Sequence, residues 1–93
     1  MARIWKYEVK PGPQEIELPE GAQFLTVRRQ DSQFGSGVFT WFLIRGPQDD
    51  KKEKRLFMVV PTGEEFECTL NDRYLGTIEV NTLMFHLFER PLG

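Results

Sequence analysis

The sequence lacks most of the residue types from which catalytic and metal sites are usually built. Its 93 residues include one cysteine, Cys68, and one histidine, His86. A single cysteine can form neither an intramolecular disulfide nor a cysteine-rich zinc site, so a reducing cytoplasm fits better than an oxidising compartment. The chain also contains no nucleophile elbow, nucleotide-binding glycine loop or His-Glu-x-x-His motif. We therefore expect no enzyme and no bound metal or cofactor.

Long apolar runs and a strong charge of one sign are absent as well. The first residues alternate between polar and apolar side chains, unlike a signal peptide, and no stretch is long enough for a transmembrane segment. Twelve basic and 14 acidic residues give a formal charge of −2, which argues against neutralising the phosphates of duplex DNA. We expect a cytoplasmic protein that contacts neither a membrane nor duplex DNA.

Short alternating segments separated by turn residues are abundant. Hydrophobic residues make up 40% of the chain and aromatic residues 13%, enough for a packed core. Alternation with a period of two predicts strands over 3–9, 14–18, 22–30, 38–44, 55–60, 74–80 and 83–88. The weaker pattern over 64–72 fits an irregular strand or a bulged loop. We expect one β domain over residues 1–93, a small antiparallel sandwich or partly open barrel of about six to seven strands with little or no helix.

Two of these segments carry specific expectations about their faces. In the strand 22–30, alternation directs Leu25 and Val27 toward the core. The segment 38–44 is apolar at every position except Thr40, which predicts a central strand covered on both faces.

Three connections also have distinct signals. The segments 31–37 and 46–53 are rich in turn-forming or polar residues and predict hairpin loops. Asn81 and Thr82 predict a tight turn between the last two strands, because asparagine tolerates a positive φ.

Apolar side chains that a single sheet would leave uncovered indicate a partner surface. Phe39 and Trp41 share one side of the strand 38–44, and Phe34 is the apolar exception in a turn segment. Because several strands are potential edge strands, we predict homo-oligomerisation by face or edge packing. These three residues, together with His86, are the candidate partner interface.

His86 is more consistent with a structural or interface role than with catalysis. A neutral-range pKa suits a general base or a metal ligand. In an extended strand, however, His86 faces the same side as Met84 and Phe88, whereas Glu89 faces the opposite side. This geometry removes the simplest catalytic pairing.

Basic residues suggest a ligand site as an alternative function. Arg28 and Arg29 are adjacent, and Arg55 and Arg73 complete the candidate set for binding a nucleotide signal beside an aromatic stacking partner. Single-stranded nucleic-acid binding is a third possibility. The basic residues near Arg55 are interleaved with Asp49, Asp50 and Glu53, which cancel most of their field.

Several segments in matching order carry a family resemblance. The most specific are Ile4-Trp5-Lys6-Tyr7, Tyr74-Leu75-Gly76-Thr77 and Phe85-His86-Leu87-Phe88-Glu89. The chain resembles a family of small proteins of unknown function encoded by bacteriophages and prophages. The resemblance implies a non-enzymatic accessory protein in the bacterial host cytoplasm. Such a protein would bind a host or phage protein in phage–host interaction or counter-defence.

Overall fold

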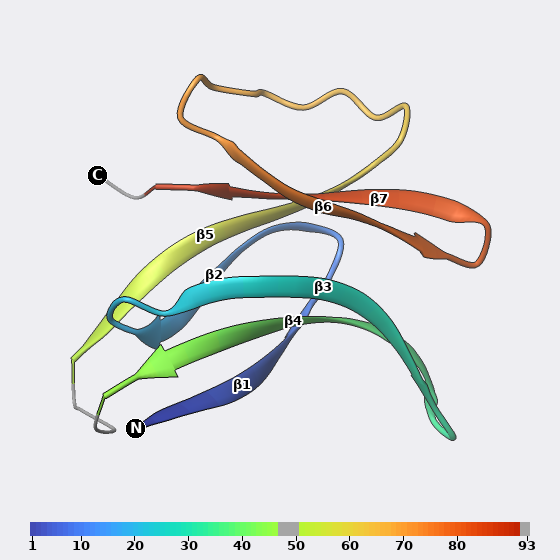
Figure 1. Ribbon diagram of the computed structural model, residues 1–93. Helices are drawn as coiled ribbons and strands as arrows, with labels where there is room; N and C mark the ends of the chain where they lie inside the picture. Colours follow the sequence, from blue (N-terminus) through green and yellow to red (C-terminus); the bar gives the residue numbers. More distant parts are fainter. Residues whose placement is uncertain (47–50, 92–93) are drawn as a thin grey trace.

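All regular structure in the described part of the chain is β. The computed structural model describes residues 1–46 and 51–91. The seven strands are β1 (Ala2–Val9), β2 (Gly12–Pro19), β3 (Gln23–Ser32), β4 (Gly35–Arg45), β5 (Lys52–Pro61), β6 (Arg73–Val80) and β7 (Leu83–Arg90) (Figure 1). The predicted all-β class is therefore confirmed.

The strands form two antiparallel sheets that are not closed into a barrel. Sheet A has the order β1-β4-β3, and sheet B has the order β2-β5-β7-β6. The Cα atoms span 40 × 37 × 16 Å, a thickness that fits two sheets stacked about 10 Å apart. The chain changes sheet after β1, β2 and β4. The predicted hairpin at 46–53 is therefore wrong, since β4 and β5 belong to different sheets; residues 47–50 lie outside the described ranges.

The hydrophobic core lies between the two sheets. Its buried members come from both sheets and from the β2–β3 connection: Val9, Leu18, Ala22, Phe42, Ile44, Phe57, Val59 and Leu87. The rings of Phe42 on β4 and Phe57 on β5 meet with centroids 5.9 Å apart, which joins the centres of the two sheets. The buried Thr40 hydroxyl donates a 3.0 Å hydrogen bond to the Tyr7 carbonyl, so this polar group is satisfied within the core.

A bulge in β3 changes which residues reach the core. Phe24 lies opposite Phe42, but the next paired residue, Thr26, lies opposite Trp41. Leu25 is the extra residue and is 42% exposed. The prediction that Leu25 faces the core is wrong, because a bulge inserts one residue into the alternation. Val27, beyond the bulge, packs against the core as predicted.

A loop covers the part of the outer face of sheet B that β5 and β7 form. Residues 62–72 contain no strand and lie over the sheet (Figure 1). Phe66 of the loop packs on Phe88 of β7 with ring centroids 5.3 Å apart. Met58 and Val60, which belong to the outer face of β5, are buried. The weak pattern at 64–72 is therefore a covering loop.

One ion pair fastens the end of this loop to the sheet. Arg90 Nε and Nη2 donate hydrogen bonds of 2.7 and 3.0 Å to the carboxylate of Asp72. Arg90 Nη2 also donates a 2.7 Å hydrogen bond to the Glu67 carbonyl. The Asp72 carboxylate also accepts a hydrogen bond from the Thr69 amide. The loop is thus held by polar contacts at one end and by aromatic packing over β7.

Candidate functional site

The outer face of sheet A presents apolar side chains from all three of its strands. Phe39, Trp41 and Leu43 of β4 are half-buried. Ile4 on β1 and Leu25 on β3 flank them and are 59% and 42% exposed. We call this surface the open face; its members are Ile4, Lys6, Glu8, Gln23, Leu25, Thr26, Arg28, Phe39, Trp41 and Leu43.

The outer side of β4 therefore differs from the sequence expectation. Its inner side chains are buried against sheet B, as predicted for a central strand. Among the described elements, no layer lies over its outer side, where Phe39, Trp41 and Leu43 keep partial contact with solvent. The prediction that both faces of this strand are covered is wrong for the outer face.

Strand register arranges the open face in rows that run across the strands. Residues directly opposite one another in an antiparallel pair project from the same side of the sheet. The rows, each written in the order β1-β4-β3, are Glu8-Phe39-Arg28, Lys6-Trp41-Thr26 and Ile4-Leu43-Gln23. Every row has an aromatic or aliphatic residue at its centre. The first row also carries an acidic residue at one end and a basic residue at the other.

Lys6 crosses the open face above β4. Its Nζ lies 4.7 Å from the centroid of the Phe39 ring and donates a 2.9 Å hydrogen bond to Gln30 Oε1 on β3. A cation held over an aromatic ring is attracted by the ring's negative face. Phe39 is therefore partly capped by polar neighbours, whereas Trp41 and Leu43 lie on the uncapped part of the surface.

The open face continues onto the β3–β4 hairpin, which extends away from the body of the two sheets (Figure 1). A groove of about 350 Å³ is lined by Lys6, Glu8, Phe34 and Phe39, among others. Phe34, near the tip, is 89% exposed. The predicted loop at 31–37 is mostly strand, because β3 runs to Ser32 and β4 begins at Gly35. Three predicted interface residues, Phe34, Phe39 and Trp41, thus share one side of the molecule.

His86 lies instead on the outer face of sheet B. Its Nε2 is 2.7 Å from Thr62 Oγ1, and its Nδ1 is 2.9 Å from Thr77 Oγ1. The Thr77 hydroxyl is in turn hydrogen-bonded to the Tyr74 hydroxyl. Both ring nitrogens are therefore satisfied within the chain, and the imidazole links Thr62, just after β5, to Thr77 within β6 across β7. Glu89 faces the opposite side of β7, as predicted.

Arg55 is occupied by an internal ion pair. Its Nε and Nη2 donate hydrogen bonds of 2.6 and 3.0 Å to the carboxylate of Glu89, and its Nη1 donates a 2.6 Å hydrogen bond to the Ala22 carbonyl. The guanidinium carbon lies 5.5 Å from the centroid of the Phe42 ring and 5.9 Å from that of the Phe57 ring. Hydrogen bonding to Glu89 raises the pKa of Arg55 above its ordinary value. All three guanidinium nitrogens already have partners.

The four candidate ligand arginines are not brought together. Arg28 and Arg29 line a shallow polar pocket between β3 and β6 with Thr77 and Glu79. Arg29 also lies 3.4 Å from Asp31. Arg73, at the start of β6, is exposed and outside this pocket, and Arg55 is between the sheets. The arrangement leaves one pair of arginines, with a carboxylate beside it.

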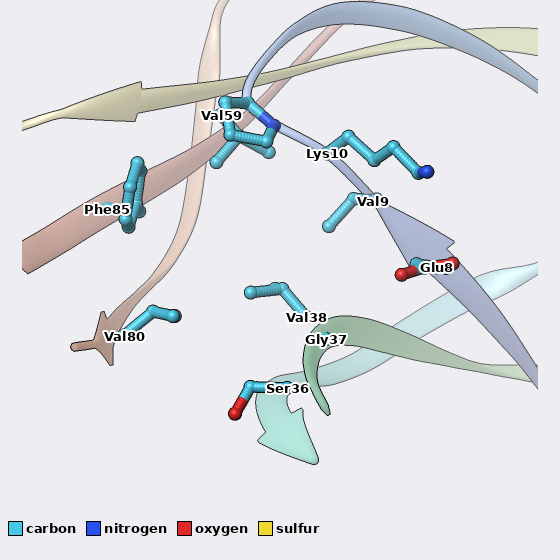
Figure 2. A pocket seen from close by; sticks show the side chains of 10 residues that line it. Glu8, Val9, Lys10, Ser36, Gly37, Val38, Val59, Val80 and Phe85 are labelled. Carbon is cyan, nitrogen blue, oxygen red and sulfur yellow. The ribbon is translucent and has the colours of Figure 1, made fainter. Parts of the chain in front are cut away.

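A second pocket opens at one end of the molecule between the sheets. Its volume is about 250 Å³. Val9, Val38, Val80 and Phe85 point into it, whereas the side chain of Lys10 points away (Figure 2). Sequence reasoning did not identify this pocket, because its walls come from strands of both sheets. Its lining is mostly apolar, and its two charged residues, Glu8 and Lys10, have opposite signs.

The described residues were compared with the requirements of a metal site and of a membrane-spanning helix. No group of three or more histidine, cysteine or acidic side chains with a metal-binding arrangement occurs in residues 1–46 and 51–91. The same ranges contain no helix of the length and hydrophobicity needed to cross a bilayer.

Comparison with known proteins identifies one family. No curated protein and no solved structure matches the chain. A family described as "Domain of unknown function (DUF7352)" matches residues 1–92. That description names no biological source, so the phage origin stays a prediction. Because the match spans nearly the whole sequence, the chain belongs to the DUF7352 family.

Proposed function

We propose that this chain is a non-enzymatic protein that acts by contact with another protein through its open face. One observation carries the proposal. The chain's own loop 62–72 covers part of the outer face of sheet B and buries Met58 and Val60 there, whereas the outer face of sheet A has an apolar centre with no such cover among the described residues. A solvent-exposed apolar patch with a polar rim is typical of a protein-binding site.

The composition of the open face supports a protein partner. Burying a large apolar side chain stabilises a complex by about 1.5–3 kcal/mol, and tryptophan and arginine are frequent binding hot spots. Trp41 lies at the centre of the face and Arg28 at its rim. The side chains stand on paired strands, so little backbone entropy is lost on binding.

The resemblance described above suggests a setting for this contact. A small phage or prophage accessory protein that binds without catalysis would serve in phage–host interaction or counter-defence. This setting is part of the proposal and rests on the resemblance alone.

Site-specific photocrosslinking tests the use of the open face. A photoreactive phenylalanine analogue replaces Ile4 on the open face, and in a matched protein it replaces Glu15, an exposed residue of β2 in sheet B. Irradiation of the cells that produce the protein is expected to give discrete protein adducts from position 4. The yield of adducts from position 15 is expected to be clearly lower. Equal labelling from both positions, or no discrete adduct from position 4, would contradict the proposal.

Sequestration of a nucleotide signal is the competing proposal. It is supported by Arg28 and Arg29 beside the Thr77 hydroxyl at one pocket. The carboxylate of Glu79 in the same lining and the engagement of Arg55 with Glu89 weaken it. A rise in melting temperature with a cyclic oligonucleotide, lost in Arg29→Gln, would favour this function over protein contact.

A further inference from the structure

We infer that the open face binds a second copy of this chain, with a two-fold axis that runs parallel to β4 above Phe39 and Trp41. The inference rests on the proposed function and names the partner of the same surface. It follows from the order of charges across the sheet.

Two identical faces in contact are related by a two-fold axis, and the direction of this axis decides which residues meet. A two-fold axis that lies in the interface along β4 pairs each row of one copy with the same row of the other copy, in reversed order. The end of the row on β1 then lies opposite the end on β3. In the row Glu8-Phe39-Arg28, this places Glu8 opposite Arg28 of the second copy, and the symmetric contact repeats the pair on the other side of Phe39.

Other two-fold axes in the same plane give poorer pairings. An axis across the strands through Phe39 sets Glu8 against Glu8 and Arg28 against Arg28, and like charges in contact are strongly unfavourable. An axis across the strands through Trp41 sets Glu8 against Ile4. An axis midway between them sets Glu8 against Lys6 but places Arg28 opposite Thr26, which offers no carboxylate.

The apolar centre of the face fits the same arrangement. An axis parallel to β4 brings Trp41 and Leu43, the uncapped part of the column along β4, against the same residues of the second copy. Phe39 joins this contact when Lys6 moves off its ring. The two sheets would then stack about 10 Å apart, as in a β-sandwich. Both charged pairs lie at the rim, where a polar border is expected.

The extent of the face sets the strength of the association. Three strands about 4.8 Å apart and about nine residues of β4 give a footprint on the order of 500 Å² per copy. Stable interfaces bury about 800 Å² per partner, so this dimer should exchange with monomer. We expect a Kd of about 10 to 100 μM, set largely by Trp41.

Sedimentation velocity over about three decades of concentration, up to about 1 mM, tests the inference. Glu8→Arg and Arg28→Glu should each raise the Kd by about tenfold or more. The double variant Glu8→Arg/Arg28→Glu should return it to within about threefold of the wild-type value, because the exchanged charges again face each other. Glu15→Arg, which makes the same charge change on an exposed position of sheet B, should leave the Kd unchanged.

Trp41→Ala provides an independent measurement on the apolar column. It should raise the Kd about thirtyfold or more. A melting curve is recorded for every variant, and the charge variants carry the decision if Trp41→Ala lowers the melting temperature. Glu8 and Arg28 are exposed, so their substitution should leave the fold intact.

Three outcomes would overturn the inference. A chain that stays monomeric up to about 1 mM has no such dimer. If the Kd of the dimer is unchanged by Trp41→Ala and by both charge reversals, the dimer uses another surface, such as the edge of β1. Charge reversals that weaken the dimer without rescue in the double variant exclude this axis. In each case, the photocrosslinking experiment decides the proposed function separately. Discrete adducts between position 4 and a different protein would support that function, and the absence of such adducts would contradict it.

Discussion

At the scale of single residues, the surroundings of each arginine decide its role. Arg55 and Arg28 have the same side chain, but one lies between two sheets and bonds to Glu89 and Ala22, whereas the other is exposed on β3. A buried ion pair is costly to break, since removing one partner leaves the other charge without compensation. Arg55 is therefore suited to joining β5, β7 and the β2–β3 connection and poorly suited to receiving a ligand.

Substitution of Arg55 tests this structural role. Arg55→Met should lower the free energy of unfolding by about 3–5 kcal/mol, because Glu89 would keep a buried carboxylate without its guanidinium. The double variant Arg55→Met/Glu89→Leu should recover at least half of that loss, since no buried charge remains. Urea unfolding at neutral pH measures both values. Arg73→Met, at an exposed position, serves as the control and should stay within about 0.5 kcal/mol of wild type. A stable Arg55→Met protein would show that the pair is dispensable.

At the scale of elements, connections carry as much information as strands. The predicted β6–β7 turn is confirmed, with φ of 51° at Asn81 and 67° at Thr82. The loop 62–72 has another role: it covers the outer side of β5 and β7 in sheet B and is anchored through Asp72 and Arg90. The difference between the two outer faces thus depends on one loop and its anchor.

The acid dependence of stability should report on this anchor. Hydrogen bonding to Arg90 and to the Thr69 amide holds the pKa of Asp72 well below its usual range. A carboxylate whose pKa is lowered in the folded state stabilises the fold fully above its unfolded pKa of about 3.9. That stabilisation is lost as the pH falls from there toward the folded value.

Asp72→Asn removes this contribution. The variant should be less stable than wild type at pH 7, and the gap should narrow as the pH falls from about 5 to about 2. Urea midpoints measured across this range for both proteins give the comparison. Parallel curves, with a constant gap at every pH, would mean that the Asp72 carboxylate does not act through its ionised form.

At the scale of the whole molecule, the two sheets approach closely where β3 meets β6. A Cβ atom added to Gly76 would lie 2.9 Å from Val27 Cγ1, closer than real Cβ atoms come. Glycine is normally a weak residue in a strand, and its replacement by alanine would be expected to help. Here the close approach of the sheets reverses that expectation.

Paired substitutions test this contact between sheets. Gly76→Ala should lower the free energy of unfolding by about 1–2 kcal/mol through overpacking. Val27→Ala removes the methyl group that it would meet, so Gly76→Ala should cost less in the Val27→Ala background. A double-mutant cycle from denaturant unfolding measures this coupling. Strictly additive effects would show that the two residues do not press on each other.

The local alternation of polar and apolar residues predicted the strands correctly but did not predict which strands lie side by side in a sheet. The seven predicted strands are present, with several extended by a few residues, as at β3 and β5. The error at Leu25 has a local cause, because one inserted residue reverses the alternation before it. The hairpin expected at 46–53 fails for a different reason: composition marks a turn but does not specify which sheet the next strand joins.

The sequence by itself determined that this chain is β, which residues alternate along most strands, and where the last hairpin turns. It also determined that the side chains of His86 and Glu89 lie on opposite faces of their strand. These properties depend on backbone geometry over a few residues. Only the tertiary structure decided that Arg55 is held by Glu89, that the loop 62–72 covers one sheet, and that Glu8 and Arg28 share a row on the other. Those relations join residues far apart in the chain, and they are set by register and sheet order, which local alternation does not encode.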